Sequence, residues 1–499
     1  MKHRINKRFF AVVLILLTGL LSNQAFAQTK EQIKAEKKAQ KEAQKEAQKL
    51  AKKKAEDPRP IIETPSTFRA ADNSQNANSI GNLKWFEIFS DEKLQELINA
   101  AVARNYDLRQ ASARINLERA NLGLTRSNQF PQIEGGAGTN TTRISENGGN
   151  AFPGIKRTRT FGSVLLNLLS FELDIWGRLR QQTKAARADL QASTEDRFAA
   201  QTTVVSDVAT GYFNLLELDS ELEIARRALA IRENSLSIIK IREQGGIATM
   251  LEVRQAEELV FQASQTIPDV ERRIEQTENF ISLLTAVHPG SIARGRTLNE
   301  QQELPEVPPG LTSELLDRRP DIRAAEQRLI ASNALIKSAK AAYFPSISLT
   351  GLFGFQSNQL SSLFTGGGNT WSFAPQIVQP IFTAGRLKSN VRFEQARQEL
   401  AVAQYEQTIQ TAFREVSDAL IERRKVKEIR AQQEQLVATL QDRSRLAYTR
   451  YEGGVDTLLN ALDAERELFD AQLQLTQTRR NELLSLVQVY KALGGGWQP

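Results

Sequence analysis

The stretch YEGGVDTLLNALDAEREL, Tyr451–Leu468, joins two long helical patterns through a break at Gly453-Gly454. A second copy, REQGGIATMLEVRQAEEL, runs over Arg242–Leu259 and breaks at Gly245-Gly246. The glycine pairs, and the threonine and Ala-Glu pair that follow each of them, are all separated by 208 positions. Glycine commonly ends a helix because it accepts a left-handed backbone. The sequence therefore predicts one helical hairpin tip that occurs twice, as the product of an internal duplication.

The remainder of the chain repeats in the same order. Residues 107–133 begin Asp-Leu-Arg-Gln and end Phe-Pro-Gln-Ile, while residues 321–347 begin Asp-Ile-Arg-Ala and end Phe-Pro-Ser-Ile. Each copy is followed by alternating apolar and polar residues, a loop rich in small and polar residues, and a Gly-Arg-Leu triplet at 177 or 385. We therefore expect each half to contain a short helix, two strands, a long helix, a tip and a return helix.

A very long helical pattern begins at Gly177 and extends to about residue 243. At about 1.5 Å per residue, roughly 65 helical residues reach about 100 Å. Leucine or valine recurs at every seventh position, as in the seam of a coiled coil. These positions are Val208, Leu215, Leu222, Leu229 and Leu236. A rod of this length cannot bury its apolar stripe alone, so the pattern predicts bundling around an axis.

Four strands are expected, two in each half. They span Gln132–Ile144, Thr158–Trp176, residues 346–356 and Trp371–Phe382. The apolar residues of the second strand that share one parity, and are expected on one face, are Leu165, Leu169, Phe171 and Leu173. Four strands cannot close a membrane barrel, because the smallest barrels have about eight strands and lipid cannot satisfy an open edge. Either the chain oligomerises to build a barrel, or its strands do not lie in a membrane.

The charge balance and residue types argue against nucleic-acid binding and against catalysis. The chain has a formal net charge of +7, but residues 1–27 and 28–57 each carry +4, which leaves −1 for the remainder. A basic surface for nucleic acid is therefore not expected. There is no cysteine, and two histidines, His3 and His288, make neither a metal cluster nor a catalytic triad. We expect no enzyme activity, no cofactor and no metal site.

The first 64 residues differ from the rest of the chain. Residues 1–27 combine a basic start, an apolar run and an Ala-Phe-Ala end, as in a secretory signal peptide. Residues 28–57 are rich in lysine, alanine and glutamate, which leaves open a solvated helix, a disordered tail or a contact with an anionic envelope polymer. The expected organisation is a signal peptide at 1–27, a charged tail and linker at 28–64, a first repeat at 65–303, a proline-rich linker at 304–319 and a second repeat at 320–499.

The paired Gly-Arg-Leu helix starts, the two Phe-Pro strand starts and the Gly-Gly-Val-Asp tip together resemble the outer membrane factor family, over roughly residues 65–495. This family contains the TolC- and OprM-like (NodT-type) exit ducts of tripartite efflux and secretion systems. The resemblance implies an α+β membrane protein that forms a homotrimer. Each chain would give four strands to one twelve-stranded transmembrane β-barrel, and its long helices would continue this barrel as an α-helical barrel across the periplasm.

The resemblance also implies a function, partners and a location. The protein would passively conduct substrates from the periplasm to the outside, in contact with outer-membrane lipid, a periplasmic adaptor and an inner-membrane pump of the RND class. It would not be lipid-anchored, because it has no cysteine. The alternative is a structural protein, a trimeric coiled-coil envelope spacer whose lysine-rich tail tethers it to the cell wall. The alternating strands favour the duct, because a spacer does not need them.

By the same resemblance, the Gly454 tip is the periplasmic entrance of the duct. Leu459 matches an apolar ring and Asp463 an acidic ring, and their spacing of four places them on one helix face. Arg466 is three residues from Asp463 and is expected to pair with it. On sequence alone Asp463 is more simply read as an ordinary solvated helix acid, and it is the trimer implied by the resemblance that favours a ring. Three copies converging in a narrow bore would repel one another and favour cations.

Further tip residues follow from the resemblance. Tyr451 and Glu252 match positions that link neighbouring helices near the closed tip. Asp456 departs from the family, because TolC has a basic residue there, and Asn460 replaces a second acidic ring, so one acidic ring is expected. The candidate adaptor contacts near the tips are Arg242, Arg254 and Arg450.

Overall fold

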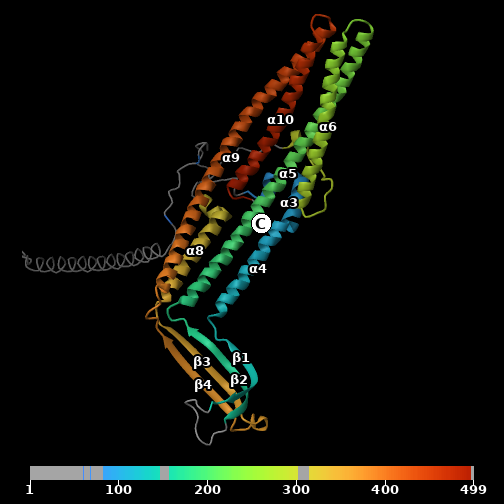
Figure 1. Cartoon of the computed structure of the whole chain (residues 1–499). Coiled ribbons are helices and arrows are strands. Elements are labelled where there is room, and N and C mark those ends of the chain that lie inside the picture. The colour runs from blue at the N-terminus through green and yellow to red at the C-terminus, as the bar shows by residue number, and fades with distance from the viewer. Residues whose placement is uncertain (1–59, 61–67, 69–82, 146–156, 302–313, 496–499) are drawn as a thin grey trace, which may run out of the picture. The chain divides into compact units, whose positions relative to one another are not determined.

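The computed structural model describes residues 60, 68, 83–145, 157–301 and 314–495. The expected signal peptide, nearly all of the charged tail, the loop at 146–154 and most of the linker at 304–319 lie outside the described residues. Apart from Pro60, all the described residues belong to one compact unit, residues 61–499. Figure 1 shows this unit with the sheet at one end and both hairpin tips at the opposite end.

The element order repeats as expected. The first half contains α2 (Trp85–Ile88), α3 (Glu92–Arg104), α4 (Tyr106–Ser127), β1 (Ile133–Arg143), β2 (Thr158–Leu173), α5 (Arg178–Gln244), α6 (Met250–Leu284) and η2 (Leu298–Glu300). The second contains α7 (Glu314–Arg318), α8 (Pro320–Ala341), β3 (Ser346–Ser357), η3 (Leu360–Ser362), β4 (Asn369–Val378), α9 (Arg386–Glu452) and α10 (Leu458–Ala492). The strand expected to reach Phe382 ends at Val378, just before Pro380, which cannot donate to a ladder.

Both long helices have 67 residues and start after a glycine in the left-handed region, Gly177 (φ 77°) or Gly385 (φ 85°). The left-handed backbone of these glycines lets the chain pass from strand to helix, which explains the Gly-Arg-Leu triplets. Each long helix ends at a hairpin tip and returns through a helix of 35 residues, α6 or α10. Among the described helices, none has both the length and the apolar character needed to cross a bilayer.

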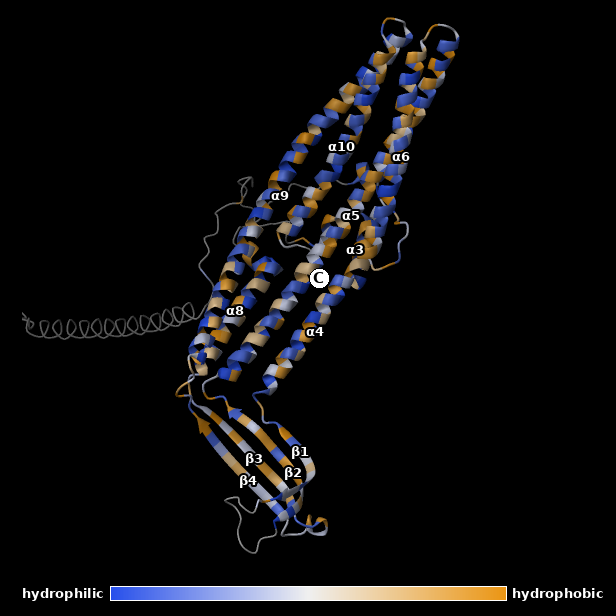
Figure 2. Cartoon of the chain, in the orientation of Figure 1, coloured by the Kyte–Doolittle hydropathy of each residue, from blue (hydrophilic) through white to orange (hydrophobic). Residues whose placement is uncertain are grey.

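The four strands form one antiparallel sheet in the order β1-β2-β3-β4. Its register places most large apolar side chains on one face. This apolar face comprises Ile133, Val164, Leu166, Leu168, Phe353, Phe355, Trp371, Phe373 and Ile377. The opposite, polar face includes Glu134, Asn167, Glu172, Ser348, Ser372 and Gln376. Figure 2 shows the resulting alternation of apolar and polar residues along the strands.

The prediction that Leu165 lies on the same face of β2 as Phe171 and Leu173 is wrong. The register shifts between Leu168 and Phe171, so one extra residue is inserted in β2 relative to β3. Such a bulge exchanges the two faces of the strand beyond it. Phe171 and Leu173 therefore share the apolar face with Leu166 and Leu168, whereas Leu165 lies on the polar face. Reading the strand by simple alternation could not detect this insertion.

Gly354 of β3 lies too close to the backbone of β2 to carry a side chain. A Cβ atom at this position would clash with the carbonyl oxygen of Val164 and lie 2.8 Å from the Cα atom of Leu165. Gly354→Ala is therefore expected to force the strands apart and to destabilise the fold by about 1–3 kcal/mol. Thermal denaturation followed by circular dichroism would measure this loss. Gly136→Ala is the matched control in β1, because a Cβ atom there meets nothing within 4 Å; equal melting of the two variants would contradict the prediction.

The long helix α5 is buried along more than one stripe. Of the expected seam residues, Val208 and Leu215 are fully buried, whereas the three towards the tip are only half-buried. A second row with the same spacing of seven is buried instead, namely Leu218, Ala225, Arg232 and Ile239. This row arises because α5 contacts α4, α6, α8 and α10 rather than a single partner. It escaped the sequence pattern because a small residue, Ala225, and a charged one, Arg232, stand between Leu218 and Ile239.

Candidate gate at the paired helix tips

The two hairpin tips have the same backbone geometry. Gly246 (φ 71°) and Gly454 (φ 72°) both adopt the left-handed conformation that ends a helix. The next residue then donates its N–H back to the helix, from Ile247 to the Arg242 carbonyl (2.8 Å) and from Val455 to the Arg450 carbonyl (3.1 Å). Gly245 and Gly453 serve as the helix C-caps. The expected duplication of the tip is thus present in the structure.

Glu252 holds the start of α6 in a capping box. Its carboxylate accepts hydrogen bonds from the Thr249 N–H (2.6 Å) and hydroxyl (3.0 Å), and the Thr249 oxygen accepts one from the Glu252 N–H (3.3 Å). This arrangement satisfies donors that the first turn of a helix leaves free. Within the described parts of the chain, Glu252 makes no hydrogen bond to the second tip. Its role as a link between helices remains a prediction.

Tyr451 and Arg242 connect the two tips. The Arg242 guanidinium carbon lies 4.6 Å from the centroid of the Tyr451 ring, a cation–π contact between the first and second halves. The Tyr451 side chain is buried, and its hydroxyl has no hydrogen-bond partner among the described residues. Burial raises the pKa of the Tyr451 phenol; the positive charge of Arg242 opposes this rise and the negative charge of Glu252 adds to it. On sequence grounds, Tyr451 is expected to link neighbouring helices and Arg242 to contact the adaptor. In the structure these two residues contact each other.

The ring candidates lie on α10, close to the second tip. The Leu459 side chain is half exposed, and Asp463 follows one turn later. The expected ion pair is present, with 3.2 Å between Arg466 Nη2 and Asp463 Oδ1. Asp456 pairs with Arg450 across 3.0 Å and accepts a hydrogen bond from Asn460 across 2.6 Å. Asp456, which stands where TolC has a basic residue, therefore has its basic partner, Arg450, within the same hairpin tip.

The three arginines proposed as adaptor contacts all have partners within the chain. Arg242 stacks on Tyr451, Arg450 pairs with Asp456, and Arg254 pairs with Glu257 across 2.6 Å. The side chains of Arg254 and Arg450 are nevertheless largely exposed. Sequence reasoning did not single out Ile247 and Val455, which are equivalent in the repeat and expose their apolar side chains at both tips.

A buried ionic cluster lies below the tips and joins all four helices. Arg232 of α5 pairs with Glu465 of α10 across 2.9 Å and donates to the Leu259 carbonyl of α6 across 3.0 Å. Tyr448 of α9 donates to the other oxygen of Glu465, and the Arg232 guanidinium lies 5.0 Å from the Phe469 ring. Burial and the negative charge of Glu465 raise the pKa of Tyr448. The sequence signals were an arginine at the buried spacing of seven and the repeated Ala-Glu pair that contains Glu465.

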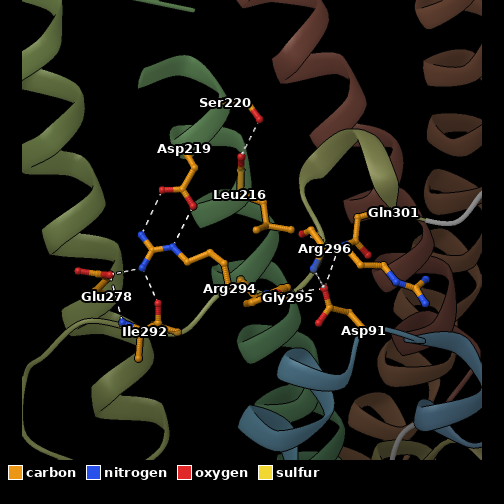
Figure 3. A network of polar contacts seen from close by, with 11 residues as sticks. Asp91, Leu216, Asp219, Ser220, Glu278, Ile292, Arg294, Gly295, Arg296 and Gln301 are labelled. Carbon is orange, nitrogen blue, oxygen red and sulfur yellow. Dashed lines mark hydrogen bonds and ion pairs between the residues drawn. The ribbon is translucent and has the colours of Figure 1, made fainter. Parts of the chain in front are cut away.

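A second polar network fixes the chain after α6, far from the tips (Figure 3). Arg294 pairs with Asp219 across 2.9 Å and also with Glu278. Asp91, the N-cap of α3, accepts hydrogen bonds from the Arg296 N–H (3.0 Å) and from Gln301 (2.9 Å). The network ties the segment between α6 and η2 to α3, α5 and α6. In the described ranges, no three His, Cys, Asp or Glu side chains gather as a metal site requires.

Comparisons with known proteins agree with this architecture. A family model described as "Outer membrane efflux protein" matches residues 97–287 and 311–495. The probable efflux pump outer membrane protein SepC of Pseudomonas putida is 39% identical over 440 residues, which cover 88% of this chain and 90% of SepC. The outer membrane protein OprJ of Pseudomonas aeruginosa is 36% identical over 446 residues, covering 88% and 91%. The open state of the Neisseria gonorrhoeae outer membrane channel MtrE superposes with a TM-score of 0.80 at 32% identity, covering 88% and 97%.

Proposed function

Because the chain belongs to the outer membrane efflux protein family, it is an outer-membrane exit duct of an efflux system and not an enzyme, and we propose that three copies assemble with their paired tips as a gated entrance. The observation that carries this proposal is the four-stranded sheet with one apolar and one polar face. Such a sheet cannot satisfy its edges in lipid alone, whereas three copies would supply twelve strands. The apolar face would contact lipid, and the polar face would line the bore.

The spacer alternative has less support than the duct. A spacer between membranes has no use for a sheet with an apolar and a polar face, and the family is one of efflux proteins. We infer that the sheet attaches the chain to the outer membrane and that the helices extend into the periplasm. The sequence contains no cysteine, so no lipid is attached to one.

We infer that the duct works with a periplasmic adaptor and an inner-membrane pump, because relatives such as SepC are named as outer membrane proteins of efflux pumps. We infer that the pump is of the RND class and that the adaptor docks on the exposed tips. Ile247 and Val455 would supply apolar contacts there, because exposed apolar side chains at equivalent places are typical of an interaction surface. Arg254 and Arg450 would add charge at the rim, whereas Arg242 is engaged by Tyr451.

In the trimer, Leu459 would form an apolar ring and Asp463 an acidic ring at the entrance. Three carboxylates within about 8–10 Å of one another attract cations, because salt screens them only partly at that distance. Tyr451 and Arg242 would hold the two tips together beside this ring. Gly246 and Gly454 would allow the helices to turn back without strain.

Asp463→Ala is expected to lower the preference of the channel for cations and to raise its single-channel conductance. The reversal potential across a planar bilayer under a salt gradient would measure selectivity. Asp442→Ala is the matched control, because Asp442 also pairs with an arginine three residues later, Arg445, but lies outside the proposed ring. An Asp463→Ala channel with the selectivity of the control would remove the acidic ring from the proposal.

A further inference from the structure

A groove crosses the apolar face of the sheet where β1 carries almost no side chains. Residues 135–138 of β1 read Gly-Gly-Ala-Gly, and they pair with residues 163–166 of β2, which place Val164 and Leu166 on the apolar face. The step from glycine to leucine leaves a groove of about 420 Å³, whose walls include Leu166, Phe353 and Phe364. This volume lies within the range of ligand pockets, about 300–1,000 Å³.

The loop between β3 and β4 forms one wall of this groove. It folds across the apolar face, because the Phe364 ring packs edge-on against the Phe355 ring with 5.5 Å between their centroids. Leu360 also approaches this face, since a Cβ atom at Gly162 would lie 4.0 Å from its Cδ1 atom. Phe353 and Phe364 nevertheless remain 59% and 69% exposed. Aromatic rings therefore border a hollow that the described residues leave open.

The lining of the groove has nothing to offer a polar ligand. Every side chain that lines it is apolar, and the glycines contribute only backbone. The strands that form its floor are paired in continuous antiparallel ladders, which engage the backbone N–H and C=O groups. A polar group placed there would lose its hydration without gaining a hydrogen bond. The groove therefore suits a hydrocarbon chain, and it is continuous with the apolar face that would contact lipid.

Strand β1 leads from the groove to a cation on the same face. Beyond Ala137, the residues of β1 on this face are Thr139, Thr141 and Arg143. The hydroxyl groups of Thr141 and of Thr160 on β2 lie 2.9 Å apart, so the face changes here from apolar to hydroxyl-bearing. Arg143 is exposed. Its Cα atom is six residues, or about 20 Å, from that of Ala137. One leaflet of hydrocarbon is about 15 Å thick, so a lipid can span this distance.

We propose that the groove binds an acyl chain of a lipid in the outer leaflet, and that Arg143 contacts the phosphate of its headgroup. The inference rests on the proposed duct, which places the strand ends opposite the helices at the outer surface. A guanidinium donates paired hydrogen bonds to a phosphate. The chain would follow the small side chains of β1 and cover the backbone that Gly135 leaves bare. Each copy would thus hold one lipid as a fixed part of its surface.

Filling the groove tests the proposal. Ala137→Phe places a ring in it, and Ile377→Phe is the matched control, because Ile377 lies on the same face of β4 outside the groove. The trimer, freed of lipid in detergent, is titrated with dipalmitoyl phosphatidylglycerol, and native mass spectrometry counts the bound lipids. We expect one tightly bound lipid per copy in the wild type and in the control. Ala137→Phe should bind about tenfold more weakly, because excluding as few as two methylene groups costs about this factor.

Arg143→Gln tests the headgroup separately from the chain. The wild type should prefer the phosphate-bearing lipid about tenfold over dipalmitoylglycerol, which has the same chains without the phosphate, because hydrogen bonds to a charged group contribute about this factor. Arg143→Gln should lose this preference and still bind dipalmitoylglycerol like the wild type. A preference that survives the substitution would overturn the contact between Arg143 and the phosphate.

Equal lipid binding by Ala137→Phe and its control would overturn the groove. A lower melting temperature of the Ala137→Phe trimer with unchanged lipid binding would show that side chains of a neighbouring copy fill the groove, and would equally overturn the inference. In each of these cases the protein would still size as a trimer and conduct ions. A protein that sizes as a single chain would overturn the proposed duct itself.

Discussion

Asp91→Ala is expected to destabilise the folded chain by about 3–5 kcal/mol, because it leaves several buried donors without an acceptor. The Asp91 carboxylate is almost completely buried and accepts hydrogen bonds at both oxygens. One oxygen caps α3 through the Lys93 N–H (2.9 Å) and the Leu94 N–H (3.3 Å). The other accepts from the Tyr212 hydroxyl (3.0 Å), besides the two donors drawn in Figure 3. Thermal denaturation of the detergent-solubilised protein would measure the loss.

The same carboxylate makes the stabilisation depend on pH. Burial alone would raise the pKa of Asp91, but hydrogen bonds from Gln301, Arg296, Tyr212 and Leu94 outweigh it and hold the pKa below its usual value. The stabilisation is therefore present above the unfolded pKa of about 4 and is lost as the pH falls through the lower folded value. Asp91→Asn should melt below the wild type at neutral pH, and the difference should shrink in acid. A difference that stayed constant down to about pH 3 would contradict this account.

The elements predicted best are those set by local rules. The helix starts at Gly177 and Gly385, the tip glycines and the Asp463–Arg466 pair all depend on residues close in sequence, and they occur as expected. The β2 bulge depends on pairing with β3, which only the folded sheet fixes. Alternation alone therefore assigned Leu165 to the wrong face.

The buried cluster at Arg232 shows a different limit of sequence reasoning. An arginine is usually read as a solvated residue, and its burial here depends on Glu465, which lies 233 positions later in the chain. No local pattern links the two residues. The duplication itself could have raised the question, because Leu440 occupies the equivalent position in the second half. Comparing the halves position by position shows a buried ion pair at Arg232 and a buried leucine, Leu440, at the equivalent place in the second half.

Arg319→Ala is expected to destabilise the fold by about 1–3 kcal/mol, because it removes hydrogen bonds to two half-exposed carboxylates and leaves the carbonyl at the end of α10 without this donor. The Arg319 side chain is buried at the start of α8, where this helix meets α9 and the end of α10. It pairs with Asp321 (2.6 Å) and with Glu415 of α9 (2.8 Å), and it donates to the Ala492 carbonyl at the end of α10 (3.0 Å). Removing it leaves two carboxylates and a carbonyl without this donor. Thermal denaturation followed by helical circular dichroism would measure the change.

The first half of the chain offers an internal reference for this site. Asn105 is equivalent to Arg319 in the repeat, and its amide donates to the Leu284 carbonyl at the end of α6 (2.9 Å) while its oxygen caps α4. Arg319→Asn should therefore recover about 1 kcal/mol relative to alanine, because asparagine is a favourable N-cap. Arg272→Ala, which removes an exposed pair with Asp269, should change stability by less than about 1 kcal/mol. If Arg319→Ala were as mild as this surface control, the buried pairs would not hold α8, α9 and α10 together at this junction.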